Sequence, residues 1–461
     1  MWFNKIGRLF IVFLSWSISG LPLYAQTIAE ADVVLLKYIQ QGLDSNLILR
    51  DKNITLEKSL LALEEAKTYF LPAVSFQGNY TLAKGGRQIS VPVGDLLNPV
   101  YNSLNQLTGT TRFPNIANVN EQFFPNNFYD MRVRMTYPVL NPELKLNQQI
   151  RQQQIKLSEA DIAIYKRELT RDIKKAYYNY LLALASLSIY EGATTVVERS
   201  LRINQSLYNN GKGLPAYIKR SEAEIIEVAA QLENAKNTAQ NAKAYFNFLL
   251  NKPLEDSLTP GKPLLEEASL SLKKYSANIS NREELQQVET AIQIQETALQ
   301  IREAFKKPRL NAFVDGGAQG FDFDFNKNSP YYLAGLQVEI PIFHGKRNLI
   351  KIEEAKINVQ QSLNQKEMVG KQLALQAFEA TNNVLTAFAN FKAAQKQVVA
   401  AKSYFKLIDL GREEGTNSFI EWLDARNQMT TSEIMEQVYK YKTLMALADY
   451  DRQHALSAIK N

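Results

Sequence analysis

Strict alternation of apolar and polar residues marks four short segments in a chain whose remaining periodicity is helical. In "VSFQGNYTL", residues 74–82, every second residue from Val74 to Leu82 falls on one face of an extended strand, and the polar residues fall on the other. The same alternation occurs in "NFYDMRVRMTYPVL", "RLNAFVDGGAQG" and "YYLAGLQVEIPIF". The pattern predicts two β-hairpins with an apolar face and a polar face. In the last strand the predicted apolar face consists of Tyr332, Ala334, Leu336, Val338, Ile340 and Ile342.

A duplication organises the chain. Pro138 and Pro341 each end a strand that runs into a long polar helix, and they lie about 203 positions apart, while Gly211 and Gly415 lie about 204 apart. Each half is therefore expected to run helix, strand, loop, strand, long helix, turn, helix. The sequence predicts a signal peptide at 1–25, a first repeat at 26–250, a linker at 251–280 and a second repeat at 281–461.

Two long segments without proline predict helices of exceptional length. They run from about 143 to 208 and from about 346 to 410, and some 65 residues at about 1.5 Å each make a helix on the order of 100 Å long. Along the first helix two apolar rows repeat every seven residues. Their members are Ile150, Leu157 and Ile164 in one row, and Ile155, Ile162, Leu169 and Ala176 in the other. Two narrow seams favour a hollow cylinder, in which each helix has a neighbour on both sides.

The N-terminus predicts export. Lys5 and Arg8 precede the apolar run "LFIVFLSWSI", and "LYA" offers a cleavage point after Ala25. This run is shorter than the roughly 20 apolar residues that a transmembrane helix needs. The chain contains no cysteine, so it has neither disulfides nor a thiolate metal site. Its net charge of +6 is spread among interspersed acids and bases, which disfavours nucleic-acid binding.

The residues show no pattern of catalysis or metal binding. The two histidines, His344 and His454, lie far apart and outside any ligand-spaced cluster, and no nucleophile elbow or Walker loop is present. Asp322, Asp324 and Asn326 have calcium-loop spacing, but Lys327 replaces the required glycine and Leu333 replaces the bidentate glutamate. We therefore expect no enzyme activity, no cofactor and no metal.

The strand lengths indicate a membrane barrel shared between chains. Strands of about ten residues match a tilted transmembrane β-strand, and tyrosines lie near their ends. Four strands cannot close a barrel, and an open edge in lipid leaves backbone groups unsatisfied. Three copies give about twelve strands, which leave an aqueous passage lined by the polar face. The alternative is a periplasmic structural coiled-coil protein without a pore, with the hairpins in a soluble sandwich.

The long helices reverse at "YNNGKGLPAYIKRSEAE" and "GREEGTNSFIEWLDARNQ". Glycine tolerates the left-handed conformation that ends a helix, and proline suits the first turn of the next helix. We therefore expect two turns, at the far end of the helices from the strands, shaped by Gly211, Gly213, Pro215, Gly411 and Gly415.

Several segments together resemble the TolC family of outer-membrane efflux proteins. These are "FLPAVSFQGNYTL", "YPVLNPELK", "LQVEIPIFHGKRNLIKIEEAK" and especially "GREEGTNSFIEWLDA". The order and doubled spacing of these segments are more specific than any single one. The resemblance covers nearly the whole exported chain.

The resemblance implies a mainly α-helical chain with a small β part. Four transmembrane strands per chain complete a twelve-stranded barrel in a homotrimer, in contact with outer-membrane lipid, and a helical barrel extends across the periplasm. Such channels conduct solutes passively and dock on a periplasmic adaptor protein, which joins them to an inner-membrane pump. By position, the docking turns run from Gly211 to Pro215 and from Gly411 to Ser418, including Thr416. The linker is expected in a belt around the helical cylinder.

Two features depart from the family pattern. The best-known members close the channel with aspartates and a tyrosine and arginine network, whereas here the helix end is "YFKLIDLGREEG". The gate candidates are Tyr404, Asp409, Arg412, Glu413 and Glu414. The connection in the first hairpin, about 83–127, is also unusually long and either covers the mouth of the tunnel or contacts a neighbour. The sequence does not identify the transported substrate.

Overall fold

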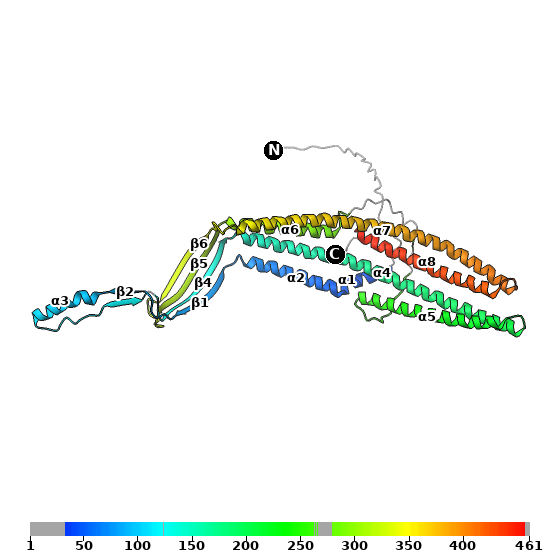
Figure 1. The fold of residues 1–461 in the computed structure, drawn as a ribbon, viewed down its shortest axis with the longest axis horizontal. Coiled ribbons are helices and arrows are strands. Elements are labelled where there is room, and N and C mark those ends of the chain that lie inside the picture. The colour runs from blue at the N-terminus through cyan, green and yellow to red at the C-terminus, as the bar shows by residue number, and fades with distance from the viewer. Residues whose placement is uncertain (1–32, 123, 262, 264, 266–278, 457–461) are drawn as a thin grey trace, which may run out of the picture. The chain divides into compact units, whose positions relative to one another are not determined.

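A computed structural model describes residues 33–122, 124–261, 263, 265 and 279–456. The predicted signal peptide and part of the predicted linker lie outside the described residues. The described chain is mostly helical (Figure 1). Its helices are α1 Val33–Ser45, α2 Leu47–Thr68, α3 Val93–Thr108, α4 Pro142–Asn209, α5 Pro215–Leu249, α6 Glu283–Glu303, the short η2 Ala304–Lys306, α7 Arg347–Glu413 and α8 Phe419–Gln453. Its strands are β1 Ala73–Thr81, β2 Gln88–Val91, β3 Val119–Gln122, β4 Phe128–Leu140, β5 Arg309–Phe321 and β6 Pro330–Glu339.

The chain divides into two compact units. The helical unit comprises the described parts of Met1–Arg50, Ala163–Arg282 and Lys371–Asn461. The sheet unit comprises Asp51–Ile162 and Glu283–Gly370. Each unit takes a part from both predicted repeats, and the long helices α4 and α7 belong to both units.

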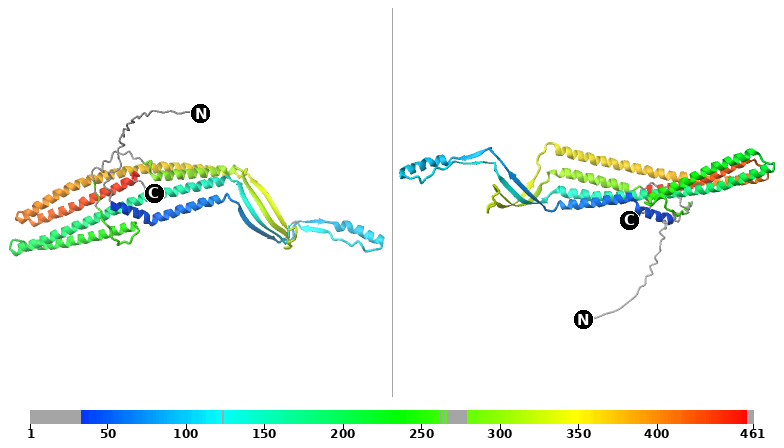
Figure 2. Two further views of the ribbon diagram at one scale, coloured as in Figure 1. Left: turned by 180° about the vertical axis from the view of Figure 1, so that it is seen from behind. Right: turned by 90° about the horizontal axis from the view of Figure 1, so that it is seen from below.

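The larger antiparallel sheet of the sheet unit has the order β1-β4-β5-β6 (Figure 2), and β2 and β3 form a second, two-stranded sheet. Its register brings the predicted apolar faces together, because Val74 lies opposite Met135, Met135 opposite Val314, and Val314 opposite Ala334. Many side chains of this face are exposed in the single chain, including Phe76 at 70% and Tyr332 at 88%. Among the described residues, no strand pairs with the outer edges of β1 and β6. An apolar face and two open edges are both left for contacts beyond this chain.

The last strand is shorter than the sequence predicts. β6 ends at Glu339, so the assignment of Ile340 and Ile342 to the strand is wrong. Pro341 has no backbone N–H for the sheet ladder, and Gly345, with φ +63°, turns the chain toward α7.

The turn between β5 and β6 is held by aromatic contacts as well as by hydrogen bonds. Tyr129 of β4 is fully buried, and its ring centre lies 5.5 Å from that of Phe323 and 4.7 Å from that of Phe325. The Tyr129 hydroxyl donates to the carbonyl oxygen of Asp324 at 3.0 Å. Tyr80 of β1 also stacks on Phe323, with ring centres 4.9 Å apart. These contacts account for the order of a turn whose sequence resembles a calcium loop.

The long helices form as predicted. α4 starts directly after β4, where Pro142 occupies the first helical position and Asn141 Oδ1 accepts the N–H of Glu143 at 3.1 Å. In α7 the buried positions of the helical unit follow heptad spacing. They are Leu373, Ala377, Ala380, Val384, Phe391, Ala394, Val398 and Ala401. α7 and α8 lie side by side in Figures 1 and 2, and Lys402 pairs with Glu433 at 2.8 Å.

The core of the helical unit joins α1, α4, α5 and α8. Its most buried members include Ile173, Tyr177, Phe246 and Leu250. α1 approaches α4 closely at Gly42, where a Cβ atom would collide with the Ile173 side chain.

One stretch of α4 is long and apolar enough to cross a membrane, which by itself is weak evidence for a span. Leu181, Ala183 and Val197 of this helix are buried in the apolar clusters of the helical unit. Their burial indicates that α4 packs on other helices.

Candidate functional site: a polar sheet face and two helix-reversal turns

The polar face of the sheet carries a charged network. Arg134 of β4 forms two parallel hydrogen bonds with Asp315 of β5, from Nε at 2.7 Å and from Nη2 at 2.6 Å. Two residues earlier in β4, Arg132 donates to Gln77 at 3.2 Å and to Asp130 at 3.3 Å. These contacts tie β1, β4 and β5 together on the face opposite the apolar one.

A glycine in β5 makes room for this network. A Cβ atom on Gly317 would lie 2.8 Å from Cβ of Arg132, which is closer than real Cβ contacts. Tyr331 of β6 completes the row, since its hydroxyl donates to Asp130 at 2.8 Å. The polar row therefore runs across all four strands.

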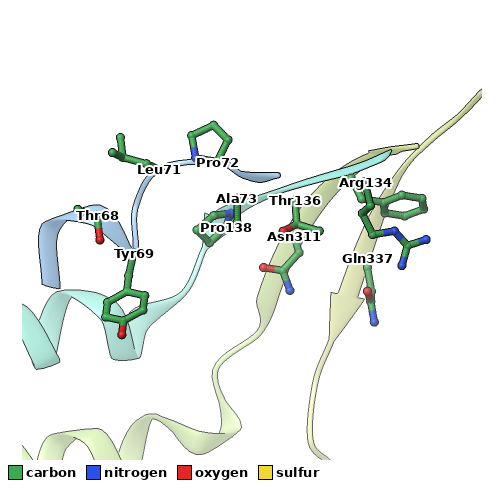
Figure 3. Close-up of a pocket in the computed structure, with 11 residues that line it drawn as sticks. Thr68, Tyr69, Leu71, Pro72, Ala73, Arg134, Thr136, Pro138, Asn311 and Gln337 are labelled. Carbon is green, nitrogen blue, oxygen red and sulfur yellow. The ribbon is translucent and has the colours of Figure 1, made fainter. Parts of the chain in front are cut away.

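A cavity of about 660 Å³ opens along this face, where the strands meet the helices of the sheet unit. Figure 3 shows Arg134, Asn311 and Gln337 on the same side of the strands, with Tyr69 from the end of α2 nearby. Phe313 also lines the cavity, and its ring occupies the place that a side chain at Gly335 would need. The face is thus polar but contains an aromatic residue that the alternation pattern did not single out.

The two reversal turns of the helical unit have matching backbones. After α4, the N–H of Gly211 bonds to the carbonyl of Tyr208 at 2.9 Å and that of Lys212 to Leu207 at 2.9 Å. After α7, the N–H of Gly415 bonds to Arg412 at 3.1 Å and that of Thr416 to Gly411 at 2.8 Å. Gly211 and Gly415 have φ values of +70° and +79°. Both turns are Schellman-type helix ends, which require a left-handed residue at this position.

The other two turn glycines serve a different purpose. The prediction that left-handed freedom explains all four is wrong for Gly213 and Gly411, because neither has positive φ. Gly411 lies within α7, and a Cβ atom there would collide with the Asn417 side chain. A Cβ atom on Gly213 would lie 2.7 Å from the backbone nitrogen of Tyr208. Both positions need glycine because the chain folds back closely on the helix end.

The second turn carries a side-chain network. Asp409 accepts a hydrogen bond from the indole nitrogen of Trp422 at 2.6 Å. Arg412 donates to Ser200 at 3.1 Å and to Asn204 at 2.8 Å, and its guanidinium lies 4.5 Å from the Trp422 ring centre. Burial lowers the pKa of Arg412, and nearby Asp409 opposes that effect. These contacts fasten the end of α7 to both α8 and α4.

Next to the first turn, α4 and α5 are joined by the hydrogen bond that Asn204 donates to Ser221 at 2.8 Å. α5 begins with Pro215 at its first position, and Leu214, which precedes it, provides no side-chain cap. In contrast, Ser418 and Glu421 form a complete capping box at the start of α8. Tyr217 of α5 contacts Phe419 of α8, with ring centres 5.3 Å apart, so the two turns lie beside each other.

Comparison with known proteins identifies the lineage. Residues 275–449 match the family model described as "Outer membrane efflux protein". The chain is 20% identical over 452 residues to the outer membrane protein TolC of Escherichia coli (strain K12), covering 94% of this chain and 84% of TolC. The predicted resemblance to the TolC family of outer-membrane efflux proteins is therefore confirmed, with the family model matching residues 275–449.

Solved structures show the same fold in other outer-membrane proteins. The CmeC outer membrane channel of Campylobacter jejuni matches with a TM-score of 0.73 and 16% identity, over 91% of this chain and 85% of CmeC. The outer membrane protein VceC of Vibrio cholerae matches with a TM-score of 0.72 and 13% identity, over 91% of this chain and 95% of VceC. The predicted fold class, a mainly helical chain with long helices and a small part of four strands, is confirmed.

The predicted gate candidates divide into two groups. Asp409 and Arg412 belong to the network described above, and Glu413 pairs with Arg199 of α4 at 2.9 Å. Tyr404 and Glu414 are exposed. Their role in gating stays a prediction.

Two of the predicted docking residues have structural contacts within their own turn. The Thr416 hydroxyl donates to the carbonyl of Gly411 at 2.9 Å, and Ser418 caps α8. These contacts explain why the two residues suit the turn, and their role in docking stays a prediction.

Sequence reasoning missed the partners of these residues. Arg412 is surrounded by Asn204, Phe419 and Trp422. The sequence pattern pointed to the segment with Phe419 and Trp422 but not to Asn204. A further buried ion pair joins Glu224 of α5 to Arg426 of α8. These partners could have been found only as polar residues at helix positions that face other helices. The periodicity of a single sequence indicates such positions only weakly.

Proposed function

We propose that this outer-membrane efflux protein is the exit duct of a tripartite efflux or secretion system and works as a homotrimer. The observation that carries the proposal is the four-stranded sheet, which has an exposed apolar face and two open edges. In lipid each open edge leaves backbone groups without hydrogen-bond partners, so β1 of one copy must pair with β6 of the next. Three copies then supply the twelve strands of one barrel.

In such a barrel the polar face lines the lumen. The charged side chains along this passage are paired and not isolated. Arg134 is paired with Asp315, and Tyr331 donates to Asp130, which also accepts from Arg132. Paired groups hold ions and zwitterions less tightly than an isolated charge does, which suits passage over binding. Conduction is passive, and the partner pump supplies the energy.

The two reversal turns are the proposed docking surface for the periplasmic adaptor. They lie beside each other, expose backbone and small residues at Gly211, Gly415 and Thr416, and are held by the Arg412 network. An adaptor can approach the backbone closely where no Cβ atom stands in the way. Through the adaptor the duct connects to an inner-membrane pump.

The test compares efflux by chromosomal variants at equal abundance in the outer membrane. Gly415→Asp and Gly211→Asp should lose most of the efflux, because a charged side chain is introduced into the docking turns. Gly192→Asp is the matched control, since Gly192 is an exposed helical glycine at which an added Cβ atom would meet no neighbour within 4 Å. Normal efflux by both turn variants would remove the turns from the proposal.

Conduction is tested separately with the purified chain in planar lipid bilayers. We expect stepwise conductance that does not depend on nucleotide. A chain that inserts without conducting would contradict the exit-duct function while leaving the fold untouched.

A further inference from the structure

The connection between β1 and β4 is a folded excursion and not an open loop. It contains β2, α3 and β3, with β2 and β3 paired from Gln88–Gln122 to Val91–Val119. Gly109, with φ +63°, ends α3. Because long connections of outer-membrane barrels lie outside the cell, the excursion belongs at the outer mouth of the channel.

The polar face of α3 is used within the excursion. Asn98 bonds to both backbone groups of Ile116, donating to its carbonyl at 3.0 Å and accepting its N–H at 2.8 Å. One heptad further, Asn105 does the same with Phe113, at 2.8 Å and 3.1 Å. Each side-chain amide thus pairs with the returning chain as a neighbouring strand would.

Two further contacts fix the same face. Asn118 donates to Asp95 at 2.9 Å and accepts the N–H of Asp95 at 3.1 Å. A Cβ atom at Gly94 would collide with the carbonyl oxygen of Ile116, so the helix is held against the returning chain. α3 cannot rotate its other side inward without losing this set of hydrogen bonds.

An apolar seam runs along α3 beside the face that the returning chain covers, with Leu97 and Leu104 exposed at 37% and 36%. Five residues follow the alternating spacing of four and three that is typical of a coiled-coil seam. They are Val93, Leu97, Val100, Leu104 and Leu107, here called the α3 seam. Val100 is 51% exposed and Leu107 is 83% exposed, with Leu96 beside them at 68%. An exposed apolar seam that extends over the length of a helix marks a surface for a partner.

The composition of α3 favours another helix over a lipid surface as that partner. Helices that lie on membranes usually carry lysine and arginine on their polar side, whereas α3 contains neither and has one acidic residue, Asp95. A narrow seam of two positions in seven also suits a helix partner better than the wider apolar face of a surface-bound helix. In the proposed trimer, α3 of each copy follows β1 of that copy, so three identical seams lie at the same end of the barrel.

We propose that the α3 seams of the three copies pack on one another and form a three-helix bundle that narrows the outer mouth of the channel. This bundle rests on the proposed trimer, and it continues the contact between copies beyond the barrel. The pairs that Asn98 and Asn105 make with the returning chain fix the direction of each helix, and the seam supplies the buried apolar surface. Solutes then leave around or through the bundle.

The chain contains no cysteine, so single cysteines report cleanly on this contact. With a mild oxidant on intact cells, Leu104→Cys should join two of the three copies by a disulfide. Gln106→Cys is the control, because it lies on the same helix but away from the seam and is exposed. The mass of the detergent-solubilised protein is measured on the same samples.

The outcomes separate the two proposals. A trimeric mass with no crosslink at Leu104→Cys or Leu97→Cys would overturn the bundle and leave the exit duct standing. Quenching of a fluorophore at Leu104→Cys by nitroxide-labelled lipid would also overturn it, because the seam would then lie on the membrane. A monomeric mass would overturn both proposals.

The narrowing is tested by removing the seam. The double variant Leu97→Gln/Leu104→Gln should raise the unitary conductance in planar bilayers, because the helices separate. Gln106→Ala is the matched control and should leave the conductance unchanged. Unchanged conductance in the double variant would contradict the claim that the bundle narrows the mouth.

Discussion

The turn after α4 and the turn after α7 have the same backbone but different side chains. Each ends a long helix with a left-handed glycine and the same pair of backbone hydrogen bonds, at positions about 204 residues apart. Tyr208 in the first turn corresponds to Arg412 in the second, and Leu214 corresponds to Ser418. Of the two described turns, the second has the capping box and the half-buried arginine network.

The difference shows what a duplication retains. The reversal of a helix depends on a backbone conformation that glycine allows, so both copies keep that solution. Side-chain contacts depend on the residues around a turn, and these differ between the two turns. Arg412 in the second turn contacts Asn204 and Trp422, whereas the corresponding residue of the first turn is Tyr208. The second turn connects α7 to α4 and α8 through Arg412 and Asp409, while the first turn has a hydrogen bond between its own two helices, from Asn204 to Ser221.

The largest expected effect comes from the ion pair that joins the helices following the two turns. Glu224→Leu leaves Arg426, which is 2% exposed, without its carboxylate, and should cost about 3–5 kcal/mol in the free energy of local opening of α5 and α8. Hydrogen exchange of these helices measures the loss.

Two further variants sharpen this prediction. Arg426→Met should cost less, because Glu224 keeps Arg220 at 3.5 Å. The double variant Glu224→Leu/Arg426→Met should recover most of the stability, since no unpaired charge stays buried. Equal losses in all three variants would show that the pair is not the source of the effect.

The next effect tests whether the two reversal turns depend equally on their left-handed glycines. Gly211→Ala and Gly415→Ala should each lower the free energy of local opening at their own turn by about 1–2 kcal/mol, because alanine is strained at positive φ. Hydrogen exchange at each turn gives the values. Gly192→Ala in α4 is the control and should be neutral or stabilising, since alanine favours a helix. A clearly larger cost at one turn would break the equivalence.

A smaller effect tests the difference in capping. Ser418→Ala should destabilise the start of α8 by about 1 kcal/mol, because the N–H of Glu421 loses its acceptor. Leu214→Ser should stabilise the start of α5 by up to about 1 kcal/mol, since Leu214 already has the extended conformation of a capping residue. Amide exchange in the first turn of each helix reports both changes. Loss of stability in Leu214→Ser would mean that the exposed leucine has a role that a cap cannot replace.

The smallest effect is a dependence on pH in the second turn. The N–H of Ser418 donates to Glu421 and lowers the pKa of that carboxyl group. A lowered pKa in the folded state means that the contribution to stability is present above the ordinary glutamate pKa and is lost as the pH falls through the folded value. Opening of the first turn of α8 should therefore increase in acid, and Glu421→Gln should remove this dependence. The start of α5 serves as the internal control.

The strands and the long helices could be predicted because their periodicity is local. The alternation from Val74 to Leu82 and the run from Pro142 to Asn209 each contain their own signal. The export prediction concerns residues outside those described, and the domain boundaries stay predictions. Alternation also predicts that Ile340 and Ile342 belong to the strand, which ends before them at Glu339. The pattern of apolar residues carries no information on the hydrogen bond that the sheet loses at Pro341.

The missed features depend on residues far apart in sequence. Arg412 bonds to Asn204 of another helix, and nothing in either local segment indicates the other. The sequence from 83 to 127 predicts only a long connection, because it has few charges and several prolines, and one of these, Pro99, lies inside α3. Its asparagines are also typical of loops, and their pairing with Phe113 and Ile116 becomes visible only in three dimensions.

We propose that the sheet of one chain is one third of a membrane barrel. The most direct measurement is the mass of the protein extracted from the outer membrane in detergent, with the detergent contribution subtracted. We expect three mature chains in one particle. A soluble monomer or dimer, absent from the membrane, would contradict it, because the exposed apolar face that includes Val74 and Leu336 would then have to be covered by protein and not by lipid.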